Sequence, residues 1–142
     1  MLIYLAGAMT AYDLDGCFEK ATEWRGYVTN HFDCNYSYLH TFDPSINYSV
    51  NKEYNSKGVV NQNLTYLKKS DIILVNLDEL DKSPGTLFEI YYAYLNNIPV
   101  VAFNSNYLYG IQPHITESIT MKFEDIFDAI DYLGSMYSQD NK

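Results

Sequence analysis

The chain has 142 residues and a mass of 16.4 kDa, a size typical of one domain. Hydrophobic residues make up 47% of it and charged residues 19%, a balance that allows a packed core and excludes disorder as the main state. A net charge of −9 and a pI near 4.5 exclude a surface built to neutralise the many phosphates of DNA or RNA, although a single nucleotide can still be bound through backbone amides and hydroxyls.

The first half of the chain shows two strand-like and two helix-like patterns. Leu2–Ala6 is a short apolar run that ends at Gly7, which is typical of a buried strand. Apolar side chains then recur at helical spacing, and a later apolar stripe ends at two lysines, which favour a helix C-terminus. These patterns predict a strand over residues 2–6, a helix over 16–30, a strand over 36–42, a loop over 45–55 and a helix over 59–69.

The second half continues this alternation. Its most strand-like run is IILVNL, and the Ser83-Pro84 pair that follows combines a preferred N-cap residue with a preferred first helical residue. We expect a strand over residues 72–77, an acidic loop over 78–82, a helix over 86–97, a strand over 98–103, a loop over 104–113, a short strand near residue 119 and a helix over 123–136. Residues 1–137 would form one domain and residues 138–142 a polar tail.

The alternation of strands and helices predicts an α/β fold with a parallel sheet covered on both faces, because each strand is a continuous apolar run. In such sheets the ligand binds at the carboxyl ends of the strands, where the strand order reverses. The segments over residues 7–15, 43–55, 78–85 and 104–113 would therefore share one rim.

Glu89 is the first candidate for chemistry, since it lies in the first turns of a helix that begins at this rim. The amides and the dipole of a helix start favour the charged carboxylate, so Glu89 could stay ionised as a nucleophile. The alternative is a surface glutamate that only complements the dipole. The apolar and aromatic residues on both sides of Glu89 favour the first interpretation.

The segment Ser83-Pro84-Gly85-Thr86 is the second candidate. Hydroxyls and a glycine at a helix start can hold a phosphate or a sugar hydroxyl, and the alternative is a simple helix cap. The segment lacks the glycine spacing of a P-loop or of a dinucleotide-binding turn. Gly7 permits close backbone approach, and candidates to line the same pocket are Tyr4, Met9, Tyr12 and Asp13.

Metal, cofactor and membrane signals are absent from the sequence. Cys17 and Cys34 have neither zinc-site spacing nor the pattern of a disulfide framework, and the three histidines are scattered. We therefore expect no metal and no cofactor. The N-terminus has no basic targeting segment, and no run reaches the ~20 apolar residues of a membrane helix, so we expect a cytoplasmic protein with no membrane partner.

Three segments resemble the nucleoside 2-deoxyribosyltransferase superfamily: IYLAGAM at residues 3–9, NQNL at 61–64 with SDIILVN at 70–76, and GTLFEIYYAY at 85–94. The resemblance covers roughly residues 2–103. It implies a Rossmann-like, flavodoxin-type fold with a five-stranded parallel sheet, and assembly into homodimers or larger oligomers that share active sites. It also implies transfer of 2-deoxyribose between bases, or hydrolysis of nucleoside or deoxynucleoside monophosphates.

The resemblance also implies roles for individual residues. The family's nucleophilic glutamate falls on Glu89 in the GTxxE segment, where it would attack the anomeric carbon and form a glycosyl ester, as retaining glycosidases do. The tyrosine that assists it falls on Tyr4. Met9 and the loop over residues 10–15 would then face the base or the sugar.

One position departs from the family pattern, and another differs between two classes of family member. Asn63 replaces the aspartate that helps protonate the leaving base, so the proton must come from solvent or from another carboxylate such as Asp13, Asp43 or Asp71. Ser83 stands where transferases of free nucleosides tend to have an aspartate, and a serine there favours a 5′-phosphate. The arginine that monophosphate hydrolases often carry after the first strand is missing, because the only arginine is Arg25, in a helix.

We expect an enzyme that cleaves the N-glycosidic bond of a 2′-deoxynucleoside or its 5′-monophosphate and transfers the sugar to a base or to water. The alternative is an inactive nucleotide-binding protein of the same fold. The expected partners are a small nucleoside or nucleotide and further copies of the chain, which would meet through the face that carries Tyr91, Tyr92 and Tyr94.

Overall fold

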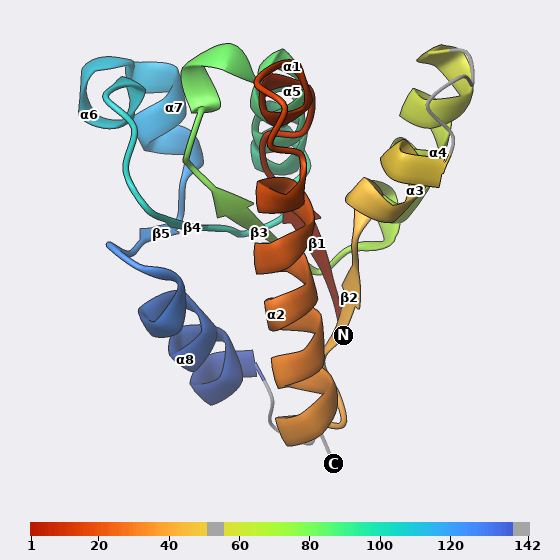
Figure 1. The fold of residues 1–142 in the computed structure, drawn as a ribbon. Helices are drawn as coiled ribbons and strands as arrows, with labels where there is room; N and C mark the ends of the chain where they lie inside the picture. The colour runs from red at the N-terminus through yellow and green to blue at the C-terminus, as the bar shows by residue number, and fades with distance from the viewer. Residues whose placement is uncertain (51–55, 138–142) are drawn as a thin grey trace.

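Five parallel strands form the centre of the computed structural model, which describes residues 1–50 and 56–137 (Figure 1). The strands are β1 (Leu2–Ala6), β2 (His40–Phe42), β3 (Ile72–Asn76), β4 (Val100–Phe103) and β5 (Met121–Lys122). Their order is β2-β1-β3-β4-β5, and every neighbouring pair is parallel. This is the flavodoxin-type order, with its reversal between β1 and β3, so the expected fold class is confirmed.

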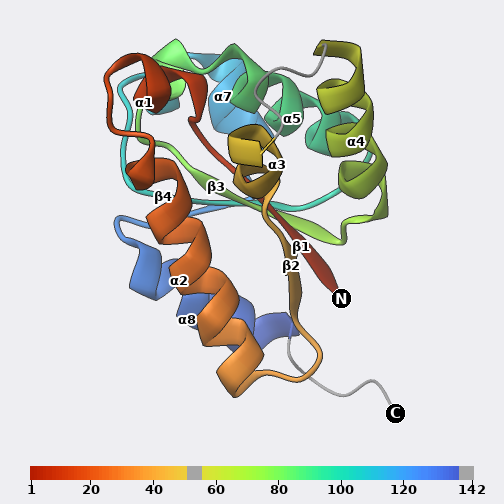
Figure 2. The same ribbon diagram turned by 45° about the vertical axis from the view of Figure 1, so that its right-hand side comes forward.

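Helices cover both faces of the sheet (Figure 2). One face packs against α2 (Glu19–Asn35) and α8 (Ile126–Tyr137), and the other against α4 (Ser56–Lys69), α5 (Pro84–Leu95) and α7 (Pro113–Ser118). Alternate residues of a strand point to opposite faces, so Ile3 and Leu5 join the first core and Tyr4 and Ala6 the second. This alternation directs the Tyr4 side chain toward α4 and α5.

The segment over residues 45–55, expected as a loop, begins instead as helix α3 (Pro44–Val50); residues 51–55 lie outside the described part of the chain. The Asp43 carboxylate starts this helix, because it accepts hydrogen bonds from the Ser45 amide at 2.8 Å and from the Ser45 hydroxyl at 2.5 Å. The strand expected over residues 36–42 is shortened to β2, because residues 37 and 38 form a turn.

Short elements replace parts of the expected loops: helices α1 (Thr10–Leu14) and α6 (Leu108–Ile111), and a 3-10 turn, η1, over Leu80–Lys82. Helix α7 follows the loop expected over residues 104–113 and was not expected. α7 begins with Pro113 as its first residue, and the Gln112 side chain accepts a hydrogen bond from the His114 amide at 3.3 Å. Such helices are too short to show an apolar period. The tail expected over residues 138–142 lies outside the described residues.

The face expected to bind further copies of the chain is less open than its sequence indicates. Tyr91 and Tyr92 are partly buried against the core, whereas Tyr94 is 53% exposed. Tyr94 and Leu95 line a groove of about 400 Å³ between α5 and α7.

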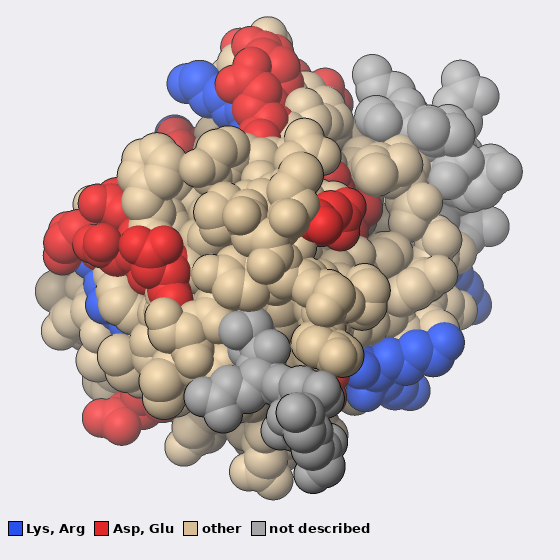
Figure 3. All heavy atoms as spheres, turned by 90° about the horizontal axis from the view of Figure 1, so that it is seen from below, with Lys and Arg blue, Asp and Glu red and all other residues tan. Residues whose placement is uncertain are grey.

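Surface charge is distributed in small groups. On the face drawn in Figure 3, basic side chains lie beside acidic ones at the top and at the left of the view, and uncharged surface separates these groups from one another. None of the helices in the described ranges is long and apolar enough to cross a membrane.

Candidate active site

A cavity of about 120 Å³ lies at the carboxyl ends of β1 and β3, where the strand order reverses. Its walls come from the segment after β1, from α4, and from the η1–α5 junction. Seven of the predicted site residues line it: Gly7, Met9, Asn63, Ser83, Gly85, Thr86 and Glu89. Tyr4 lies behind Glu89 and is fully buried, whereas the two other candidates, Tyr12 and Asp13, do not line the cavity.

Glu89 is the sixth residue of α5 and is only 8% exposed, so the alternative of a surface glutamate is wrong. The Tyr4 hydroxyl donates a hydrogen bond to its Oε2 atom. Burial raises the pKa of Glu89 from 4.5 to about 7, while the Tyr4 hydrogen bond and the charge of Arg25 oppose this rise. The expected effect of a helix start on the ionisation of Glu89 is therefore outweighed by the loss of water around the carboxyl group.

Tyr4 is held as a neutral phenol. Burial, together with the neighbouring Glu89 carboxylate, raises the pKa of Tyr4 far above its ordinary value. A phenol next to a carboxylate donates a hydrogen bond to it without transferring its proton. Tyr4 therefore orients the Glu89 side chain and stabilises its charged form.

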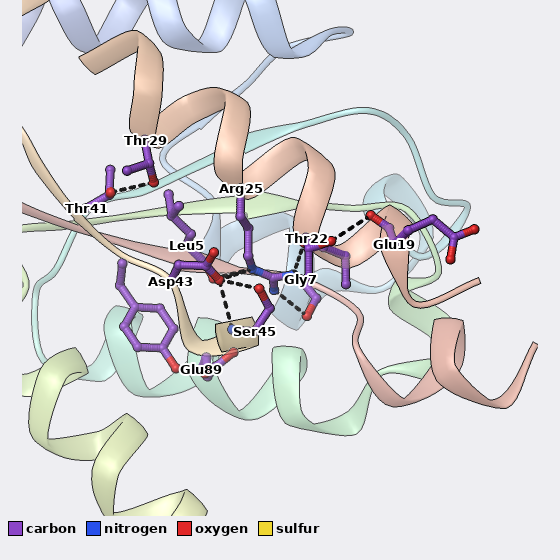
Figure 4. A network of polar contacts seen from close by, with 12 residues as sticks. Leu5, Gly7, Glu19, Thr22, Arg25, Thr29, Thr41, Asp43, Ser45 and Glu89 are labelled. Carbon is purple, nitrogen blue, oxygen red and sulfur yellow. Dashed lines mark hydrogen bonds and ion pairs between the residues drawn. The ribbon is translucent and has the colours of Figure 1, made fainter. Parts of the chain in front are cut away.

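Arg25 is a component of the site that sequence reasoning missed. It is fully buried, and its guanidinium donates hydrogen bonds to the carbonyl oxygens of Leu5 at 3.1 Å, Ala21 at 2.8 Å and Gly7 at 2.9 Å (Figure 4). Its Nε atom is 3.7 Å from the Asp43 carboxylate. A signal was present, because residue 25 occupies the same helical stripe as the buried residues 21, 28 and 32.

Gly7 is needed for close packing beside this arginine. A Cβ atom at residue 7 would lie 3.1 Å from the Trp24 ring, 3.3 Å from the Asn76 Cβ and 3.4 Å from the Arg25 Nη2 atom. The Gly7 carbonyl accepts from Arg25 while the residue itself forms part of the cavity wall. The close backbone approach expected at Gly7 is therefore made to the protein's own side chains.

Asn63 carries the clearest unfilled polar group of the site. Its Oδ1 atom is buried and has no hydrogen-bond partner among the described residues. Asn63, Gly85 and Glu89 also line a second cavity of about 80 Å³ whose other walls are mainly apolar. Asn63 and Glu89 therefore both line the polar cavity and the apolar one.

Ser83 occupies the N-cap position of α5, but its side chain does not cap the helix. The Ser83 hydroxyl donates instead to the Glu79 carbonyl oxygen at 2.8 Å, so the expected side-chain cap is wrong. Lys82 lines the same wall and pairs with the Glu79 carboxylate at 3.3 Å. Lys82 is a cation that the sequence reading did not consider at this site.

The three carboxylates considered as proton donors are engaged elsewhere. Asp13 accepts a hydrogen bond from Tyr48 at 3.1 Å, and Asp43 is bonded to residue 45 and paired with Arg25. Asp71 accepts from the Leu2 amide at 2.9 Å, at the end of β1 remote from the cavity, so it anchors structure. Among the described residues that line the cavity, Glu89 is the one carboxylate. Over the same ranges, no group of His, Cys, Asp or Glu residues could hold a metal ion.

Comparison with known proteins gives a consistent result. The model of the family described as "Nucleoside 2-deoxyribosyltransferase like" matches residues 1–107. No curated protein matches the chain closely enough to count as a relative.

Three solved structures share the fold. A 2-deoxyribosyltransferase from Bacillus psychrosaccharolyticus is 22% identical with a TM-score of 0.64, over 93% of this chain and 92% of that one. A conserved protein from Enterococcus faecalis V583 is 18% identical with a TM-score of 0.71, over 95% and 98%. A 2-desoxiribosyltransferase from Leishmania mexicana is 17% identical with a TM-score of 0.63, over 96% and 98%.

Proposed function

The chain belongs to the nucleoside 2-deoxyribosyltransferase-like family, and from this premise we propose that it cleaves the N-glycosidic bond of a 2′-deoxynucleoside or of its 5′-monophosphate. Glu89 is the nucleophile, and the sugar passes to another base or to water. The observation that carries the proposal is the buried Glu89 carboxyl group, which accepts a hydrogen bond from Tyr4 and lines a cavity at the reversal of strand order.

The reaction takes two displacements at the anomeric carbon. In the first, the Oε1 atom of Glu89 forms an ester bond with that carbon, and the base leaves with the electron pair of the glycosidic bond. In the second, a nitrogen of an acceptor base or a water oxygen displaces Glu89. Two inversions return the original configuration. Tyr4, bonded to Oε2, holds the carboxyl group in place during both steps.

The leaving base takes its proton from solvent in this scheme. The Asn63 amide cannot supply one, and Glu89 must be ionised to attack. Asn63 would instead contact the base or the sugar through its free amide oxygen. Because Ser83, Gly85 and Thr86 line the same cavity at the start of α5, we assign them to the sugar hydroxyls or the 5′-phosphate, and we assign Gly7 and Met9 to the rest of the ligand.

The test is to incubate the protein with the four common 2′-deoxynucleosides and with their 5′-monophosphates, with and without a free acceptor base, and to separate the bases by chromatography. We expect released base in the absence of acceptor, exchanged base in its presence, and neither with Glu89→Gln. Binding without release or exchange by both proteins would favour the alternative, an inactive nucleotide-binding protein.

A further inference from the structure

The charged side chain of Arg25 lies in the protein interior. The side chain is fully buried, and its hydrogen bonds to Leu5 and Gly7 fix it to the carboxyl end of β1. Three main-chain carbonyls accept from it at 3.1 Å or less, so its position is set by the backbone. A planar guanidinium can serve three acceptors in fixed directions, which a lysine ammonium does less well.

Two carboxylates share this one buried cation. Asp43 approaches Arg25 at 3.7 Å from the β2–α3 junction, and the Arg25 and Glu89 charges also interact. Figure 4 shows Asp43, Arg25 and Glu89 in one cluster, with Glu89 on the side of Asp43 and Ser45. The phenols of Tyr4 and Tyr12 also face Arg25, and both stay neutral because burial raises the pKa of each. The charges in the cluster are therefore those of Arg25, Asp43 and Glu89.

We propose that Arg25 is a positioning residue that keeps Glu89 in its charged, attacking form, and that Asp43 sets how much of the arginine charge Glu89 experiences. The description of Glu89 as attacking rests on the proposed function; the electrostatic arrangement does not. Arg25 donates to the protein backbone and does not line the cavity, so it would support the nucleophile from within the core.

The proposal requires opposite effects from two substitutions. Removing the cation with Arg25→Gln must make ionisation of Glu89 harder, whereas removing the competing anion with Asp43→Asn must make it easier. Arg25→Lys keeps the charge and should stay close to the unmodified protein. A residue that only supports the fold would not shift the ionisation in both directions.

The direct measurement is an NMR titration of the Glu89 side-chain carboxyl carbon in the free protein, assigned by its loss in Glu89→Gln. Relative to the unmodified protein, we expect the midpoint to rise by about one pH unit in Arg25→Gln and to fall by a similar amount in Asp43→Asn. The matched control is Lys20→Gln, which removes an exposed cation from the same helix and should leave the midpoint in place. Unchanged midpoints in folded Arg25→Gln and Asp43→Asn would overturn the proposal.

The titration separates the role of Arg25 from effects on folding and from the proposed activity. If Arg25→Gln does not fold, the outcome rests on Asp43→Asn, and a midpoint that stays or rises there contradicts the proposal. Because the titration needs no substrate, a protein without base release can still show the expected shifts. In that case the proposed function fails while the role of Arg25 stands. If base release is found, the acidic limb of kcat/KM should move with the titration midpoint in each variant.

Discussion

Tyr4 and Glu89 are 85 positions apart in the sequence, yet the hydroxyl of the first donates a hydrogen bond to the carboxylate of the second inside the protein. The bond joins strand β1 to helix α5 on one face of the sheet. It is possible because the strand alternation turns Tyr4 to the α5 side, while the buried residues 86, 90 and 93 keep the same side of α5 against the sheet. The geometry of the candidate site and the packing of the core are therefore parts of one arrangement.

The buried carboxyl group makes stability depend on pH. Glu89 has its pKa raised from 4.5 to about 7 in the folded protein, so between these values the folded state binds a proton that the unfolded state releases. The contribution of Glu89 to the free energy of unfolding is therefore full below about pH 4.5, falls as pH rises, and is lost above about pH 7. The expected loss is roughly 3 kcal/mol.

Denaturant unfolding of the protein and of Glu89→Gln at pH values across this range measures the effect. Glutamine stays neutral, so the free energy of unfolding of the variant minus that of the unmodified protein should grow toward high pH. Equal slopes for the two proteins would contradict the raised pKa. Glu23→Gln, at an exposed position on α2, is the control for loss of a carboxylate at the surface.

Tyr4→Phe tests whether the Tyr4 hydroxyl supports the Glu89 carboxylate. Loss of a hydrogen bond to a charged group should cost about 1.5–3 kcal/mol of stability at pH 8. Because this hydrogen bond lowers the pKa of Glu89, its removal should move the acidic limb of kcat/KM to higher pH. Tyr66→Phe, which removes a hydroxyl from the same layer, should leave that limb in place. A limb that does not move in Tyr4→Phe would assign Tyr4 to packing alone.

Asn63→Asp should raise the rate of base release. The substitution places a carboxyl group beside Glu89 at the boundary between the two cavities, where it can deliver a proton to the leaving base. The expected gain is about tenfold or more at its optimum, and initial rates from pH 5 to pH 8 measure it. Asn61→Asp adds the same charge at an exposed position of α4 and should have no effect. No gain in Asn63→Asp would mean that protonation does not limit the rate.

Ser83→Asp should separate the two classes of substrate. The side chain lies at the start of α5 beside Lys82, on the cavity wall that we assign to a 5′-phosphate. A carboxylate there repels the phosphate, so the affinity for a deoxynucleoside 5′-monophosphate should fall about tenfold or more while that for the free deoxynucleoside changes little. Calorimetric titration of both ligands against both proteins measures this. Equal losses would show that Ser83 does not meet the phosphate.

The groove between α5 and α7 should lie at a contact between copies of the chain. Tyr94 is 53% and Leu95 75% exposed beside it, an apolar surface that a second copy can bury. Sedimentation velocity at micromolar concentration should show a dimer or a larger species. Leu95→Glu should shift the sedimenting species toward the monomer. Met136→Glu, which replaces an exposed apolar residue on α8, should not. A monomeric unmodified protein would refute this assignment.

The elements that sequence patterns predict well are those long enough to show a period. The strand over Leu2–Ala6 has its expected bounds, and the helices ending at Lys69 and Leu95 differ from expectation by a few residues. The short helices α1, α3, α6 and α7 escape such reasoning because caps and turns, not periodicity, define them. The rim itself was predicted, since the carboxyl ends of parallel strands lie on one side.

The electrostatics of the site could not be read from the chain. Glu89 was placed correctly, but its burial depends on the packing of α5 against β1 and α4, which no local pattern contains. Arg25 was set aside as a helix residue because a charged side chain is ordinarily assigned to solvent. Its place in a stripe of buried residues was the signal that would have changed this interpretation.

One wall of this cavity leaves little room for larger side chains. At Gly7 even a methyl group meets the Trp24 ring at 3.1 Å, and the carbonyl of the same residue holds Arg25. A side chain at residue 7 would crowd Arg25 and would thereby alter the reactivity of Glu89. Libraries should instead vary Met9 and Thr10, which line the same cavity and are not among the hydrogen-bond or ion-pair partners of Arg25.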